Sequence, residues 1–97
     1  MKLSISSNAL SNIAEIWAYG ENALVVYLKG GKKVRVTATR NIYSGSQYKF
    51  APMYEEEITI EISEAKHAVW TSIALSSPGG DTIELCLENA LRFLNTI

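Results

Sequence analysis

The residues that could do chemistry in this chain are few. It holds one histidine, His67, one cysteine, Cys86, and one aspartate, Asp81. Nucleophilic catalysis needs an activated Ser, Cys or Thr beside a base and a group that orients the base. Asp81 stands where it would cap a helix. Cys86 falls on the apolar stripe of that helix with no cation beside it, as a small buried hydrophobe does. We therefore expect a protein that is not an enzyme.

The sequence predicts neither a metal site nor a cofactor. A structural zinc site takes four Cys or His ligands, and this chain has two such residues. The run Glu55, Glu56, Glu57 could hold a hard cation, but neighbours along a strand point to opposite faces, so we interpret it as a solvated segment. Residues 76–80 precede a predicted helix as a phosphate loop would. No cation follows them, however, and Asp81 would repel the anion.

The charges are divided between the two halves of the chain. The net charge is −1 over 97 residues. Residues 1–50 carry seven Lys or Arg against two Glu, whereas residues 51–97 carry two against eight acidic residues. Cations interleaved with tyrosines are what a nucleotide or single-stranded nucleic acid needs. The basic half therefore gives an alternative hypothesis, an anion, nucleotide or nucleic-acid site formed by Lys32, Lys33, Arg35, Arg40 and Lys49.

The same charges have a simpler interpretation, which we favour. Lys33 and Arg35 share the polar face of one predicted strand, and Glu57 and Glu61 share that of another. If the two strands are neighbours, the four side chains form a cross-strand charge ladder that recognises nothing outside the molecule.

The aromatic residues and the acidic run favour a protein partner. Large amphipathic rings rimmed by charge are typical of interfaces, and a domain of this size cannot cover them all. We predict a non-enzymatic interaction module that binds another protein, of the kind found among phage and mobile-element inhibitors, and that forms a homo-oligomer. The candidate contacts are Tyr43, Tyr48, Tyr54, Glu55, Glu56 and Glu57.

The elements that must position these residues belong to an α+β fold. We predict an antiparallel meander of four to six strands with a C-terminal helix packed on one face. Period-two alternation indicates strands with one buried face, including the isoleucine face of residues 56–63. The predicted strands are 13–19 (with a helix over 8–19 as the alternative), 23–29, 32–39, 56–63 and 67–76.

The connections between the predicted elements and the ends of the helix also have sequence signals. Gly30-Gly31 predicts a two-residue hairpin turn, and residues 40–55 predict a long aromatic loop, with a short strand inside it as the alternative. Apolar residues at three- and four-residue spacing predict a helix over 82–96 with Asp81 as its N-cap. The chain forms one domain, 1–97, and we expect a cytoplasmic protein because no signal-peptide or membrane-spanning run occurs.

Two resemblances accompany these predictions. The element order is similar to that of a pleckstrin-homology-like roll. Ser6-Ser7-Asn8 through Tyr19, with Leu24, Val26, Leu28 and Gly30, resembles the KTSC domain, a small bacterial and phage family, over about a quarter of the chain. Residues 33–36 depart from that family's preference for tyrosines, so no site residue is carried over.

Overall fold

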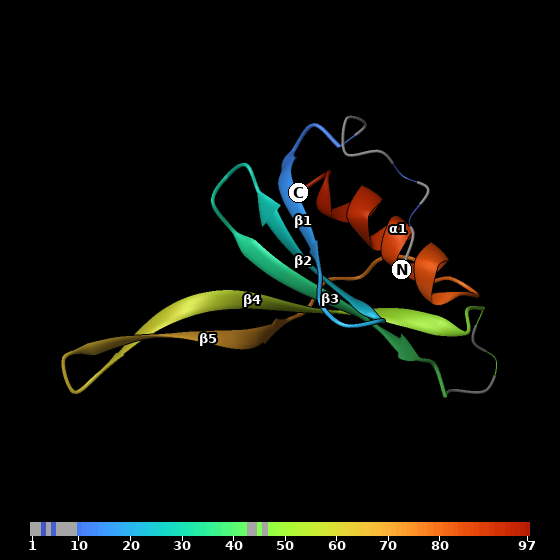
Figure 1. Ribbon diagram of the computed structural model, residues 1–97. Coiled ribbons are helices and arrows are strands. Elements are labelled where there is room, and N and C mark those ends of the chain that lie inside the picture. Colours follow the sequence, from blue (N-terminus) through green and yellow to red (C-terminus); the bar gives the residue numbers. More distant parts are fainter. Residues whose placement is uncertain (1–2, 4, 6–9, 43–44, 46) are drawn as a thin grey trace.

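The protein is one five-stranded antiparallel sheet covered on one face by a single helix (Figure 1). A computed structural model describes residues 3, 5, 10–42, 45 and 47–97. The strands follow one another across the sheet in chain order, which confirms the predicted α+β meander with a C-terminal helix. The elements are β1 (Ile13–Ala18), β2 (Ala23–Leu28), β3 (Lys33–Arg40), β4 (Phe50–Ile62), β5 (Ala65–Ile73) and α1 (Ile83–Leu94).

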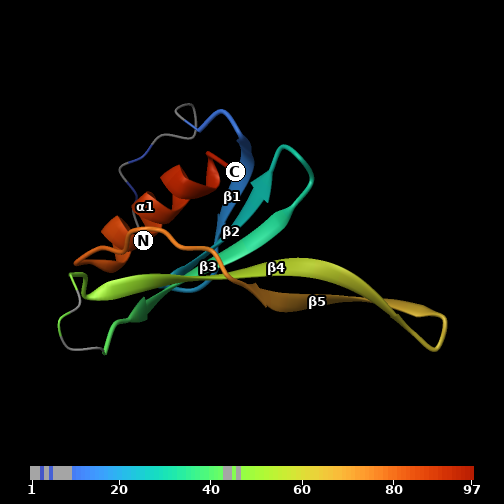
Figure 2. The same ribbon diagram turned by 180° about the vertical axis from the view of Figure 1, so that it is seen from behind.

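The core lies between α1 and the near face of the sheet (Figure 2). Alternate residues of β3 are buried, as the pattern predicted, because a helix covers one face of that strand. A hydrogen bond anchors the C-terminal end of α1 to the residue that precedes β1: the backbone N–H of Asn12 donates to Oδ1 of Asn95 at 2.8 Å. The helix contributes Cys86, Leu87, Ala90, Leu91 and Leu94 to the core, and the sheet contributes chiefly Leu24, Val26, Val34, Val36 and Tyr54.

The N-cap of the helix lies one residue later than predicted. Thr82 is the N-cap, and its hydroxyl accepts from the backbone N–H of Leu85 at 3.0 Å. Asp81, predicted for this role, instead accepts from the backbone N–H of Lys49 at 3.4 Å. Thr82 caps the helix because its hydroxyl reaches the backbone N–H of Leu85, the third residue of the helix.

Two predicted connections differ from the structure. β4 already begins at Phe50, so the second part of the predicted loop 40–55 is strand. β2 ends at Leu28 and β3 begins at Lys33, so the turn at Gly30-Gly31 spans more than two residues, and only Gly31 has a positive φ, +98°. Gly30 therefore does not need the left-handed freedom that a two-residue turn would require of it.

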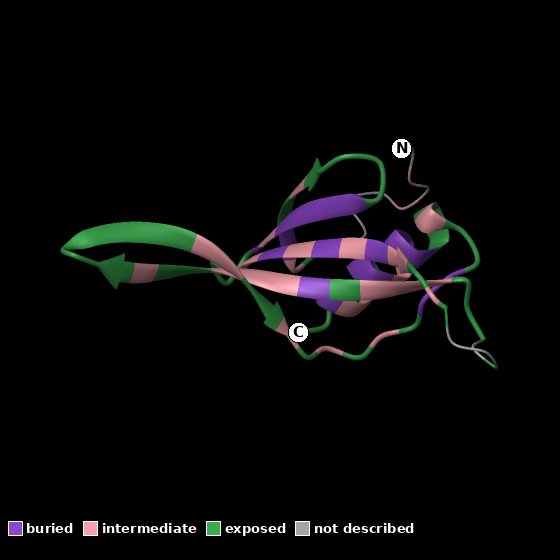
Figure 3. Cartoon of the chain, turned by 90° about the horizontal axis from the view of Figure 1, so that it is seen from below, coloured by how far each residue is buried: buried purple, intermediate pink, exposed green. Residues whose placement is uncertain are grey.

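The second half of β4 and most of β5 project beyond the body of the molecule (Figure 1). A strand of this length extends about 43 Å, whereas the helix over the sheet is about 18 Å long. Every residue from 58 to 68 except Ile60 is exposed (Figure 3). The prediction of a buried isoleucine face here is wrong, because no helix reaches this part of the sheet. We call residues 56–71 the projecting hairpin.

Candidate functional site

The outer face of the sheet, opposite α1, carries a charge ladder between β3 and β4. The register places Arg35 opposite Glu55. Nε and Nη2 of Arg35 both donate to Oε1 of Glu55, at 2.9 and 2.8 Å. Nζ of Lys33 lies 3.0 Å from Oε2 of Glu57. The predicted pairing of the two charged halves is confirmed, although the acidic partners are Glu55 and Glu57 and not Glu61.

Aromatic rings enclose both cations of this ladder. The guanidinium of Arg35 lies 5.1 Å from the ring centre of Tyr19 and 4.6 Å from that of Trp70. Nζ of Lys33 lies 5.3 Å from the ring of Tyr27 and 5.6 Å from Trp70. Hydrogen bonding to Glu57 raises the pKa of Lys33. Such stacking adds to the ion pairs and holds the outer face of the sheet in place.

The five cations of the basic hypothesis do not form one surface. Lys33 and Arg35 are paired within the ladder, and Nζ of Lys32 lies 4.0 Å from Oε1 of Glu56. Arg40 and Lys49 are exposed at the other end of β3, about 23 Å along the strand from Lys33. Three of the candidate cations thus already have carboxylate partners, and the other two stand apart.

The acidic run is divided in the same way. Glu55 and Glu57 point to the outer face, whereas Glu56 points to the opposite face, as alternation along a strand requires. Each of the three has a cation at 4.0 Å or less. The run therefore does not present a single acidic edge.

The three candidate tyrosines have different surroundings. Tyr54 is buried, and its ring lies 5.9 Å from that of Phe93 on α1. Its hydroxyl is hydrogen-bonded to Ser77, and burial raises its pKa. Tyr48 is exposed in the connection before β4. Tyr43 lies outside the described residues. Tyr54 is thus a core residue with no surface for a partner, because alternation in β4 turns it toward the helix.

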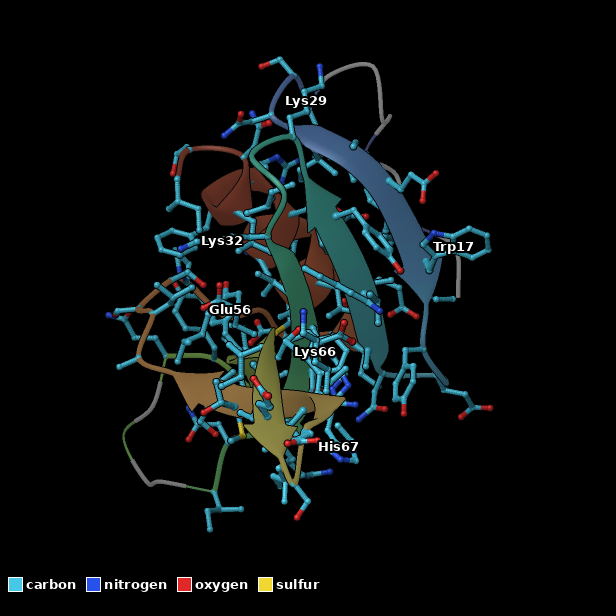
Figure 4. The ribbon with its side chains drawn as sticks, turned by 90° about the vertical axis from the view of Figure 1, so that its left-hand side faces the viewer. Trp17, Lys29, Lys32, Glu56, Lys66 and His67 are labelled. Carbon is cyan, nitrogen blue, oxygen red and sulfur yellow. The ribbon has the colours of Figure 1, made fainter. Side chains whose placement is uncertain are left out.

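The residues considered for catalysis are not brought together. Cys86 is fully buried in α1, and desolvation raises its pKa to about 11. His67 is exposed near the tip of the projecting hairpin, and its side chain points to the opposite face from that of Lys66 (Figure 4). Among the residues that the structure describes, no group of three or more His, Cys, Asp or Glu could hold a metal ion. In the same residues, no helix is long and apolar enough to cross a membrane.

One shallow cleft of about 500 Å³ opens on the outer face beside the β1–β2 turn. Its polar wall is formed by Arg35 and Glu55, which are bonded to each other. An anionic ligand would have to displace the carboxylate of Glu55 from that guanidinium. The remaining lining residues are Tyr19, Gly20, Asn22, Ala23 and Thr37.

An uncovered apolar stripe runs along one face of the projecting hairpin. Directly opposed residues of antiparallel strands point to the same face. Ile58 pairs with Val69, Ile60 with His67 and Ile62 with Ala65. Ile58 is 39% exposed and Ile62 is 55% exposed, whereas Ile60 and Val69 are half-buried. We call Ile58, Ile60, Ile62 and Val69 the apolar stripe.

The period-two alternation of the two predicted strands, 56–63 and 67–76, predicted that this stripe lies in the core. The signal that could have exposed the error is length, because a helix over 82–96 is about 22 Å long and too short to cover every predicted strand. The exposed rings of Trp17, which points away from the sheet at the β1 edge (Figure 4), and of Tyr19 were also left without a specific role.

No family model, curated protein or solved structure matches the chain. The likeness to the KTSC domain therefore does not assign the chain to that family. The likeness to a pleckstrin-homology-like roll concerns the order of the elements alone.

Proposed function

We propose that this protein is a non-enzymatic interaction module that binds another protein through the apolar stripe of its projecting hairpin. The observation that carries the proposal is that Ile58, Ile60 and Ile62 follow one face of a strand that no other element among the described residues covers. Monomeric soluble proteins rarely expose contiguous apolar patches larger than roughly a few hundred Å², and larger patches mark interaction sites. The role of an inhibitor of the phage or mobile-element kind remains a prediction.

The accessible surface of the molecule is larger than that of a compact monomer. It is 6400 Å², against about 5500 Å² for a compact monomer of its mass. The projecting hairpin is the part of the chain that departs most from a compact shape.

The basic alternative has less support. A nucleic-acid site needs cations that are free to meet phosphates. Lys33 and Arg35 are held between carboxylates and rings on the outer face, and Lys32 lies beside Glu56.

Site-specific photocrosslinking inside cells tests the proposal. A photoreactive amino acid replaces Ile60 on the stripe. Two controls carry it at Thr59, on the opposite face of the same strand, and at Leu85, which is 43% exposed on α1. The proposal predicts a covalent adduct with one defined protein from position 60 and not from position 59 or 85. Equal adducts from all three positions, or none from position 60, would contradict it.

A further inference from the structure

The two edges of the sheet differ in how well they are protected. β1 carries a register shift between Ile13 and Glu15, and such bulges prevent an edge from pairing with another strand. β5 pairs with β4 without a shift from Ala65 to Ile73, and it contains no proline. Its one lysine, Lys66, lies at the tip end. β5 is therefore a long, regular edge strand with few of the features that block strand addition.

The turn of the hairpin determines which backbone groups of β5 face outward. Ser63 and Glu64 have φ of 52° and 66°, as both central residues of a type I′ turn do. The residues that flank such a turn, Ile62 and Ala65, form a hydrogen-bonded pair. Because hydrogen-bonded and non-bonded pairs alternate in antiparallel strands, the outward N–H and C=O groups belong to every second residue of β5. These are Lys66, Ala68, Trp70 and Ser72.

We propose that β5 pairs with β5 of a second copy of this chain, antiparallel and centred on Val69. In this register Lys66 meets Ser72 of the second copy, and Ala68 meets Trp70 of the second copy. All four outward residues of each strand are then hydrogen-bonded, and the whole of β5 is overlapped. Shifting the register by two residues leaves outward groups unpaired at both ends.

The side chains suit this twofold pairing. On the outer face the small Ala68 lies beside the large ring of Trp70 of the second copy. Lys66 lies beside a serine, so the two lysines are not opposed, and like charges directly opposite would destabilise the pair. On the other face Val69 meets its own copy and Ala65 meets Ile73. A closed twofold pairing also uses up the free edge in both molecules, which limits further addition.

This inference rests on the proposed function in taking the hairpin as the interacting element, but it uses a different surface. Strand pairing occupies the edge of β5, whereas the apolar stripe lies on a face of the hairpin. A strand from an unrelated protein could use the same edge. The twofold match of β5 to itself favours a second copy, and the tests below separate the two.

Disulfide trapping tests the register directly. In the proposed dimer Val69 and its copy form a non-hydrogen-bonded pair with Cα atoms about 4.5 Å apart, within the range of a disulfide. The two copies of His67 would lie at least about 13 Å apart along the strands, beyond that range. Val69→Cys is expected to form a covalent dimer under mild oxidation, whereas His67→Cys and the wild-type chain, whose Cys86 is buried, are not. Absence of the Val69→Cys dimer, or an equal yield from His67→Cys, would overturn the proposal.

Sedimentation of a proline variant tests the edge. Ala68→Pro removes an outward N–H that β4 does not use, so the hairpin is retained while pairing is blocked. The wild-type chain and Ala68→Ser are expected to sediment as dimers. Ala68→Pro is expected to weaken dimerisation by about 10- to 100-fold while keeping cooperative melting. A wild-type monomer at every concentration, or a dimeric Ala68→Pro, rejects the pairing. If Ala68→Pro fails to fold, the comparison of Val69→Cys with His67→Cys decides whether β5 pairs with its copy.

The two proposals can fail independently. A monomeric wild-type chain whose position 60 still crosslinks one protein rejects the dimer and keeps the proposed function. A β5-paired dimer whose position 60 crosslinks nothing rejects the proposed function and keeps the dimer.

Discussion

Arg35 connects three parts of the outer face at the scale of a single residue. Its guanidinium donates twice to Glu55, lies against Tyr19 from the β1–β2 turn and lies against Trp70 from β5. Its side chain is only 17% exposed, so this pair is shielded from solvent more than an ordinary surface pair. The residue that looked most suited to an anionic ligand thus contributes to the stability of the sheet.

A double-mutant cycle on Arg35 and Glu55 measures this contribution. Arg35→Met, Glu55→Gln and the double variant are expected to give a coupling of about 1–2 kcal/mol in urea unfolding, because two nitrogens of Arg35 donate to one oxygen of Glu55 and the pair is partly shielded. The matched cycle on Lys32 and Glu56 is expected to give less than about 0.5 kcal/mol, because Lys32 is 64% exposed and the atoms are 4.0 Å apart. Equal couplings would show that Arg35 has no special role.

Because Cys86 is buried, we expect the free energy of unfolding to change with pH in the alkaline range. Desolvation raises the pKa of the thiol from 9.0 to about 11, which favours the neutral form in the folded state. Its contribution is fully present below pH 9 and is lost as the pH rises toward 11. Burial raises the pKa of Tyr54 in the same direction.

We predict that the free energy of unfolding falls between pH 9 and pH 11, with Cys86 contributing about 2–3 kcal/mol of the loss. Cys86→Ala lowers stability at neutral pH by leaving a small void, but its loss over the alkaline range is smaller. Urea unfolding at several pH values measures how steeply the free energy of unfolding falls with pH in the wild-type chain and in Cys86→Ala. An unchanged alkaline slope in Cys86→Ala would show that the thiol is not responsible.

At the scale of elements, the segment before α1 is held against the start of β4 by a close backbone approach. Phe50 and Gly80 exchange backbone hydrogen bonds of 2.9 and 3.0 Å. A Cβ atom on Gly79 would lie 2.0 Å from the carbonyl oxygen of Phe50. The sequence indicated only a loop that precedes the helix, because a steric need of this kind depends on a strand far away in the chain.

Gly79→Ala is therefore expected to lower the free energy of unfolding by about 2–4 kcal/mol, since backbone must shift to admit the methyl group. Gly30→Ala is the matched control, because its added Cβ would meet nothing within 4 Å and its φ is not positive. It is expected to change stability by less than about 0.5 kcal/mol. Thermal melting of both variants compares them, and equal effects would refute the close approach.

The elements themselves were largely predictable from local pattern. Alternation in residues 32–39 and helical spacing after residue 82 predicted β3 and α1, because each buries one face against the other. The site was not predictable in the same way. Alternation in residues 56–63 is identical whether or not something covers the apolar face, and which cation meets which carboxylate depends on strand register.

The whole molecule is elongated for its length. Its radius of gyration is 14.2 Å, against about 12.5 Å for a compact domain of 97 residues. The body holds the core, and the hairpin that extends from it is mostly exposed (Figure 3), with Ile58 and Ile62 among its exposed residues. The body buries the core between its sheet and α1, and the hairpin carries the exposed surface on which the proposed function rests.

The measurement that tests this account most directly is thiol labelling on the two faces of the hairpin. Ile60→Cys lies on the apolar stripe and Thr59→Cys on the opposite face of the same strand. Both thiols are expected to react rapidly with a maleimide in the purified protein. Inside cells the account predicts that Ile60→Cys is protected while Thr59→Cys reacts as before. Equal reactivity of both thiols in both settings would contradict the claim that the apolar stripe binds a partner.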